Sequence, residues 1–183
     1  MNSFYKVLRQ AKYEARTKSL LDSNVHSSLE LMTISPEYSN VKIFYGRSPF
    51  FVQYFSLNQV TIYKELFKYK HPIIVSLDAT GNIVSKVKNN KQIFLYQMVT
   101  QKSEKNPQLP ITQMLSSQHD ALSISVWLER WLVESGKIPT VAVLDCSRAL
   151  LNAAVKSFTK FKSLNAYVEY LKDIRRVKWY AIF

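Results

Sequence analysis

The sequence is poor in cysteine, glycine, long apolar runs and acidic residues, and each shortage excludes a class of protein or site. A single cysteine, Cys146, excludes an intramolecular disulfide and suits a reducing compartment. Three glycines in 183 residues exclude the usual phosphate-binding glycine loops. No apolar segment follows Met1 as in a signal peptide, and none approaches the ~20 residues of a membrane span. We therefore expect an intracellular protein that uses neither a membrane nor a small-molecule cofactor.

The shortage of acidic residues leaves a large positive charge. There are 25 Lys and Arg residues against 13 Asp and Glu residues, a net charge of +12, and the pI is about 9.7. Such a field attracts polyanions, and nucleic acid gains binding free energy by releasing counterions. Lysines also serve solubility, and a basic helix can meet acidic membranes. We favour DNA as the partner, with a nuclear location, and assign the first contacts to a predicted helix over 3–20 that carries Lys6, Arg9, Lys12, Arg16 and Lys18.

The chain divides into three parts by composition. Residues 1–48 form a basic helical N-terminal region, 49–71 an extended arm and helix, and 72–183 the core. In the core, continuous apolar runs at 73–78 and 140–145 predict strands buried on both faces. Two further strands are expected at 92–100 and 109–115, after turns at 79–82 and 103–107.

Helical periodicity completes the predicted core. An apolar stripe with i, i+3, i+4 and i+7 spacing predicts a helix over 124–133, and Ser147 is a good N-cap for a helix over 148–158. A right-handed crossover through the first helix makes the strand at 140–145 parallel to the strand at 73–78. The result is an α/β fold in which a three-stranded meander is followed by a crossover helix, a parallel fourth strand and a helix. The spatial strand order is third, second, first, fourth.

Two aspartates stand apart from the other three. Asp78 and Asp145 each end an apolar strand, where an unpaired carboxylate is costly and ligands commonly bind. Parallel neighbouring strands would bring them together, and paired carboxylates suit hard divalent ions such as Mg²⁺. In the alternative interpretation, Asp78 caps a turn at Thr80 and Asp145 caps the following helix. Because both lie on strands that the topology makes adjacent, we favour the metal site.

Four segments in this order and spacing resemble a known family: SLDATG at 76–81, QIFLYQ at 92–97, QMLSSQHD at 113–120 and LDCSRALLNA at 144–153. Together they are similar to the core of Mutator-like (MULE-type) DNA transposases. The resemblance implies a ribonuclease-H-like fold and an Asp-Asp-Glu site that holds two Mg²⁺ or Mn²⁺ ions. Asp78 and Asp145 match the first two acids, and His119 falls in a matched segment near the site. The implied reaction is DNA strand hydrolysis, then attack of the freed 3′-hydroxyl on target DNA.

The sequence departs from the family after Asp145. Glu169 is the only glutamate in that stretch, on a predicted helix over 164–171, and its charged neighbours indicate a solvated surface residue. No third acid is therefore identified, and we expect weak ion binding. Three interpretations stay open: a transposase or part of one, a non-catalytic nucleic-acid-binding or interaction protein derived from a transposase, and a two-acid nuclease. The sequence makes no prediction of oligomeric state.

Overall fold

The computed structural model describes residues 21–22, 24–69, 71–81, 92–101 and 107–173. The predicted basic helix over 3–20, with Lys6, Arg9, Lys12, Arg16 and Lys18, lies outside these residues.

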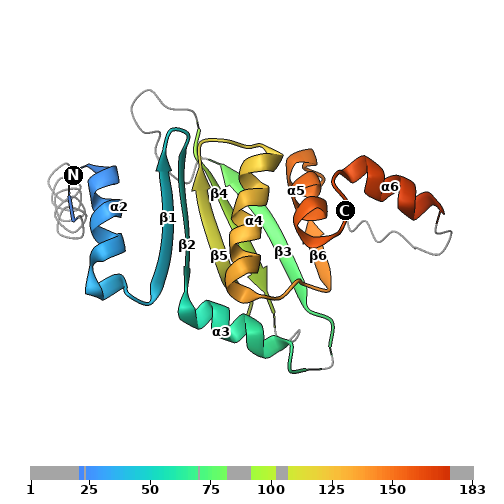
Figure 1. The fold of residues 1–183 in the computed structure, drawn as a ribbon, viewed down its shortest axis with the longest axis horizontal. Helices are drawn as coiled ribbons and strands as arrows, with labels where there is room; N and C mark the ends of the chain where they lie inside the picture. Colours follow the sequence, from blue (N-terminus) through green and yellow to red (C-terminus); the bar gives the residue numbers. More distant parts are fainter. Residues whose placement is uncertain (1–20, 23, 70, 82–91, 102–106, 174–183) are drawn as a thin grey trace, which may run out of the picture.

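A six-stranded sheet forms the centre of the molecule (Figure 1). Its strand order is β1-β2-β5-β4-β3-β6, and every neighbouring pair is antiparallel except β3 and β6, which are parallel. The predicted order of the last four strands is therefore confirmed, together with the parallel pair that follows the crossover helix. The strands are β1 (Val41–Arg47), β2 (Phe50–Ser56), β3 (Ile74–Gly81), β4 (Phe94–Thr100), β5 (Leu109–Ser116) and β6 (Val141–Leu144).

Five α-helices accompany the sheet within the described residues, and side-chain caps fix where several of them begin. Ser56 and Gln59 form a reciprocal capping box at the start of α3, while Asp120 caps α4 and Ser147 caps α5. At the end of α4, Gly136 adopts a left-handed conformation with φ of 63°, which favours glycine. The helices are α2 (Val25–Ile34), α3 (Leu57–Leu66), α4 (Ala121–Ser135), α5 (Arg148–Phe158) and α6 (Leu164–Asp173).

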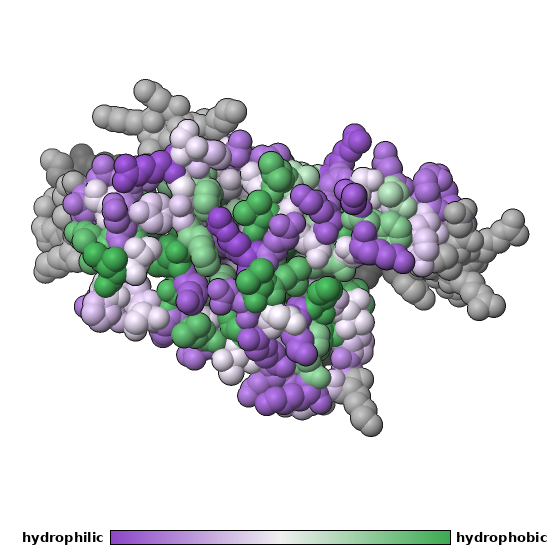
Figure 2. Space-filling model, viewed as in Figure 1, coloured by the Kyte–Doolittle hydropathy of each residue, from purple (hydrophilic) through white to green (hydrophobic). Residues whose placement is uncertain are grey.

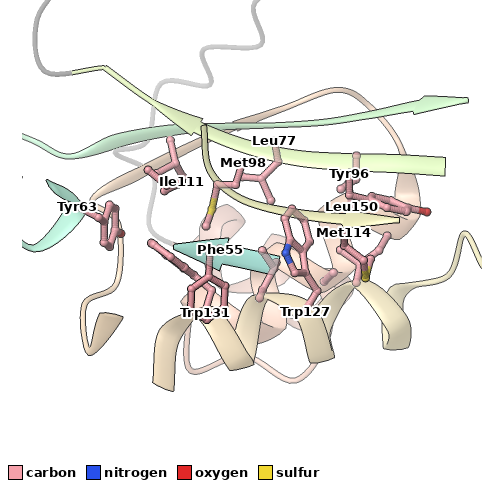
Figure 3. Close-up of a cluster of buried hydrophobic side chains, with 14 of the residues drawn as sticks. Phe55, Tyr63, Leu77, Tyr96, Met98, Ile111, Met114, Trp127, Trp131 and Leu150 are labelled. Atoms are coloured by element: carbon pink, nitrogen blue, oxygen red, sulfur yellow. The ribbon is translucent and has the colours of Figure 1, made fainter. Parts of the chain in front are cut away.

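The main core lies between one face of the sheet and helices α3, α4 and α5 (Figures 1 and 3). Trp127 and Trp131 of α4 are fully buried, and the Trp131 ring meets Phe55 edge-on with the ring centroids 5.3 Å apart. Large aromatic rings of this kind contribute most of the apolar area that a small domain can remove from water. The α4 stripe predicted from the sequence is thus the centre of the core.

Buried polar groups fix α4 on the sheet in one position. The indole nitrogen of Trp127 donates to Thr112 Oγ1 of β5 at 3.0 Å, and the Gln53 amide of β2 donates to the Trp127 carbonyl at 2.9 Å. Arg130 in turn donates to Gln53 Oε1 at 3.3 Å and lies over the ring of Phe51. Because a buried amide or indole without a partner is costly, these bonds disfavour other positions of the helix.

The opposite face of the sheet is covered over only part of its width. Phe50, Val52 and Ile93 form a second buried cluster there, against which Leu29 of α2 packs. At β3 and β6 this face stays open: Ile74, Val141 and Val143 are 46%, 41% and 42% exposed. The prediction that these two strands are buried on both faces was therefore wrong, because helices cover only one side of them.

Two other differences from the sequence analysis concern strands. The strand β1 was missed, since Lys42, Gly46 and Arg47 interrupt its apolar pattern and it pairs only at the sheet edge. The turn expected at 79–82 begins later, because β3 continues to Gly81 in register with β4. The segment at 49–55, interpreted as a strand or arm, is the inner strand of the β1–β2 hairpin. The division of the chain into parts at residues 48 and 71 stays a prediction.

The molecular surface around α4 mixes apolar and polar patches (Figure 2). Leu122 and Val133 on the outer side of α4 are 66% and 82% exposed. Isolated exposed apolar residues are normal in soluble proteins and carry no functional argument here.

The polar contacts beneath α4 lead to the first prediction. Thr112→Val keeps the shape of the side chain but leaves the Trp127 indole N–H without its acceptor, so we expect stability to fall by about 1–3 kcal/mol. Thr61→Val on the exposed side of α3 is the matched control and should change stability by less than about 0.5 kcal/mol. Urea unfolding of the three proteins measures this, and an equal effect of both substitutions would contradict it.

Candidate functional site

Asp78 and Asp145 lie at the same end of the sheet, on its two parallel strands. The register pairs Val75 with Ala142 and Leu77 with Leu144, so the next step sets Asp78 of β3 beside Asp145, directly after β6. Adjacent strands are spaced by about 4.8 Å, which brings the two backbone positions close together. The crossover through α4 therefore juxtaposes the two aspartates, as the sequence predicts.

Both carboxylates are exposed, and both already accept local hydrogen bonds. Asp78 accepts the Ala79 backbone N–H at 2.8 Å and the Thr80 hydroxyl at 3.2 Å. Asp145 accepts the Ser147 backbone N–H at 2.9 Å, an arrangement typical of an aspartate that begins a turn before a helix. These bonds engage both oxygens of Asp78 and one oxygen of Asp145, and the lone pairs that remain on the exposed carboxylates can still receive a further ligand.

A row of polar side chains extends from Asp78 across the open face of the sheet. Asp78 pairs with Gln97 of β4, Gln97 pairs with Gln113 of β5, and Gln113 pairs with Tyr54 of β2. Residues paired in register point to the same side of a sheet. All but Asp78 are partly buried, and burial raises the pKa of Tyr54. The two amide groups and the phenol thus continue the row that begins at the Asp78 carboxylate, with one group on each successive strand.

His119 lies in the loop between β5 and α4, and it connects β4 with the start of α5. Its Nδ1 is 2.7 Å from the Tyr96 hydroxyl, and its Nε2 is 3.4 Å from the hydroxyl of Ser147. The imidazole also stacks on the rings of Phe94 and Tyr96, with centroid distances of 4.8 and 5.8 Å. Ser147 follows Asp145 by two residues in the chain, so this contact places His119 near Asp145. No contact among the described residues joins His119 to Asp78.

Tyr96 holds the His119 imidazole through a hydrogen bond with a hydroxyl that stays protonated. The side chain is fully buried, and its hydroxyl also donates to the Gln118 carbonyl at 3.1 Å. Burial, with a smaller contribution from the Asp120 carboxylate, raises the pKa of Tyr96 well above its usual range. The phenol consequently stays protonated. Because its O–H donates to the Gln118 carbonyl, its oxygen is the acceptor for the N–H of His119 Nδ1.

No third ligand joins the two aspartates within the part of the chain that the structure describes. There, no group of three or more His, Cys, Asp or Glu side chains could hold a metal ion. Glu169 on α6 is exposed and pairs with Lys172 at 2.8 Å, as expected for a solvated surface residue. Asp120 uses its two oxygens at the start of α4, where they accept from the Ser123 N–H and hydroxyl.

The basic residues are concentrated in certain stretches of the sequence. Residues 1–20, 82–91 and 174–183 together contain eleven of the 25 Lys and Arg residues and one of the 13 Asp and Glu residues. Among the residues that the structure describes, no helix is long and apolar enough to cross a membrane.

Sequence reasoning did not identify several residues around the aspartates. In the sequence, Tyr96 and Gln97 look like an ordinary core residue and an ordinary surface residue of a strand. Only the structure shows that Tyr96 contacts His119 and that Gln97 lies beside Asp78. Ser147 was recognised as a helix cap, but its contact with His119 joins positions 28 residues apart. The i, i+2 spacing of Phe94 and Tyr96 places these two rings on one face of the strand, and this is the signal that the sequence offers.

Comparison with known proteins relates the chain to a transposable element. It is 34% identical over 160 residues to the "120.7 kDa protein in NOF-FB transposable element" of Drosophila melanogaster. The matched region covers 84% of this chain and 15% of that protein, so the chain spans a small part of its relative's length. No protein-family model and no solved structure matches the chain. The similarity indicates a transposon-derived protein.

The second prediction concerns the support of His119. Tyr96→Phe removes the hydroxyl that joins the Gln118 carbonyl to His119 Nδ1, so we expect a loss of about 1–2 kcal/mol and altered NMR shifts of the His119 ring nitrogens. Tyr63→Phe, at an equally buried ring whose hydroxyl meets only the Lys137 carbonyl, is the control. If the His119 signals respond equally to both substitutions, the contact with Tyr96 does not hold the imidazole.

Proposed function

We propose that this chain contains part of a Mutator-like DNA transposase core of the ribonuclease-H-like class, in which Asp78 and Asp145 bind Mg²⁺ or Mn²⁺ next to DNA. The observation that carries the proposal is the parallel register of β3 and β6, which sets the two aspartates side by side. The similarity to a transposable-element protein supports it independently. The strand order predicted from the meander and the crossover helix is also the order of β5, β4, β3 and β6.

The residues present fit a hard divalent cation in part. Carboxylate oxygens are the ligands that Mg²⁺ and Mn²⁺ prefer, and both side chains are open to solvent. Bound ions of this kind stabilise the attacking and leaving oxygens of a phosphodiester. Asp78 and Asp145 would supply the negative charge that retains the ions, while Ala79 and Ser147 orient the carboxylates through their backbone N–H groups. Two acids alone favour weak binding.

The charge distribution supports DNA as the partner and a nuclear location. Residues 82–91 join the end of β3, three residues after Asp78, to the beginning of β4, and this connection contains Lys86, Lys88 and Lys91 with no acidic residue. In the sequence these three lysines follow Asp78 by eight to thirteen residues. Positive charge close to the carboxylates would offset their repulsion of the DNA backbone.

A second candidate function is nucleic-acid binding without catalysis. It is favoured by the hydrogen bonds that Asp78 and Asp145 accept from their own turns, since a carboxylate with a structural role needs no metal. In this case the chain keeps the fold and the basic segments of a transposase but neither binds ions nor cuts DNA.

Divalent-ion binding separates the two candidates. We expect Mn²⁺ to bind the wild-type chain weakly, and Asp78→Asn or Asp145→Asn to reduce its affinity at least tenfold, because each removes a charged ligand. The folded state should persist in both variants, since asparagine retains an oxygen for the local hydrogen bond. Isothermal titration, or the paramagnetic effect of Mn²⁺ on water relaxation, measures the affinity.

Asp22→Asn is the matched control for Asp145→Asn. Asp22 accepts the backbone N–H of Asn24, two residues ahead, as Asp145 accepts that of Ser147. It precedes α2 and takes no part in the β3–β6 pairing. Equal Mn²⁺ binding by all four proteins would reject the metal site and favour the non-catalytic function.

The N-terminal segment gives a separate prediction for DNA. Residues 1–20 contain five basic residues and one acidic residue, so their deletion should flatten the slope of log affinity against log salt by roughly 3–4. Lys64→Gln on α3 with Lys68→Gln in the turn after it, both exposed, should change the slope by less than about 2. Fluorescence anisotropy with a duplex of unrelated sequence measures both slopes, and an unchanged slope after the deletion would exclude this segment from DNA contacts.

A further inference from the structure

A polar cleft opens beside His119, at the same end of the sheet as the two aspartates. It has a volume of about 330 Å³ and is lined by Gln92, Phe94, Ser117, Gln118, His119 and Asp120. Ligand pockets commonly begin at about 300 Å³, so the cleft is large enough for one flat ring system. We propose that this cleft binds a single nucleobase of a DNA strand. The inference rests on the proposed function and names the part of the DNA that this end of the molecule recognises.

Aromatic surfaces supply the first part of the argument. The rings of Phe94 and His119 stack on each other at 4.8 Å with an interplanar angle of 30°, and His119 is exposed while Phe94 is half-buried. Exposed aromatic faces are the surfaces on which proteins stack unpaired bases. Tyr96 holds the imidazole by its hydroxyl, so the stacking surface is fixed before a ligand arrives.

Amide groups supply hydrogen bonds at the border of the same cleft. The side chains of Gln92 and Gln118 each offer a donor and an acceptor, which is what the edge of a base requires. The Gln118 oxygen accepts from the Ser123 hydroxyl, while the structure records no hydrogen bond of the Gln92 side chain within the described residues. Gln92 is therefore available to a ligand.

Gly81 makes room for Gln92. A Cβ at this position would collide with the Gln92 amide nitrogen and would lie 3.5 Å from the Phe94 ring. The last residue of β3 thus accommodates the amide because it has no side chain. A substitution there displaces the flexible end of Gln92 without disturbing the buried core.

The charge of the cleft selects a base over a phosphate. Asp120 contributes the one carboxylate of this lining, and that carboxylate repels a phosphate group. A base is uncharged, and its amino groups can donate to oxygens of the lining. The phosphates of the bound strand would lie outside the cleft, away from the Asp120 carboxylate.

The test compares two single-stranded oligonucleotides of equal length, one of deoxyadenosines and one of abasic sites, in EDTA. Their phosphate charges are the same, so a difference in affinity reports base recognition alone, and no metal is required. We expect the wild-type chain to bind the adenine oligonucleotide about tenfold more tightly, the effect of one stacked base. Quenching of a 2-aminopurine placed in the strand gives a second readout of stacking.

Three variants test whether the preference for the adenine oligonucleotide arises in the cleft. His119→Ala should abolish the preference for the adenine oligonucleotide and leave the affinity for the abasic one unchanged, whereas His119→Phe should retain the preference by keeping a ring. Gly81→Ala should reduce it by moving Gln92. His71→Ala, at an exposed histidine before β3, is the control and should behave as the wild type. Thermal unfolding confirms that each variant is folded.

The possible outcomes distinguish this inference from the proposed function. Equal affinity for the two oligonucleotides, or a preference that survives His119→Ala, would overturn the base site while leaving Mn²⁺ binding by Asp78 and Asp145 to its own test. Failure to bind either oligonucleotide would overturn both the base site and DNA as the partner. Loss of Mn²⁺ binding alone would leave the base site intact, because the comparison is made without metal.

Discussion

The packing of α4 against the sheet is the interaction on which the other features depend. Two tryptophans bury the helix in the main core, and hydrogen bonds from Trp127 to Thr112 and from Gln53 to the helix backbone fix where it lies. Because α4 returns the chain across one face, β6 enters the sheet parallel to β3. The parallel pair, in turn, places Asp78 and Asp145 at one end, and the start of α4 brings His119 to the same end. The positions of Asp78, Asp145 and His119 at this end of the sheet therefore depend on how α4 packs in the core.

The sequence predicts the parts of the fold that depend on local patterns with strong physical causes. The stripe of α4, the cap at Ser147 and the crossover rule were enough for the order of four strands. Burial was harder to predict, because an apolar run such as that of β3 is consistent with one covered face or two. The structure shows Ile74 and Val143 exposed, which depends on where helices lie and not on the strand itself. The edge strand β1 was missed for a similar reason.

The sequence predicted that the strands carrying Asp78 and Asp145 are parallel neighbours, while the metal-binding role of these residues stays a prediction. The partners of each aspartate depend on register: Gln97 adjoins Asp78 only because β3 and β4 pair in one particular alignment. The contact of His119 with Ser147 joins two loops and leaves no trace in either local sequence. Long-range pairing, which no local pattern encodes, decides both contacts.

The shortness of β6 has a consequence for how these molecules behave at high concentration. β6 is the last strand of the sheet, so its outer edge has no partner strand among the described residues, and Val141 and Val143 are exposed on its open face. Unpaired edges with apolar side chains are templates on which a second molecule can add a strand. The strand β6 has four residues, and the backbone N–H and C=O groups of about two of them point away from β3 toward the free edge. These groups offer too few hydrogen bonds for stable pairing with a second molecule. A longer strand here would favour sheet growth from one molecule to the next.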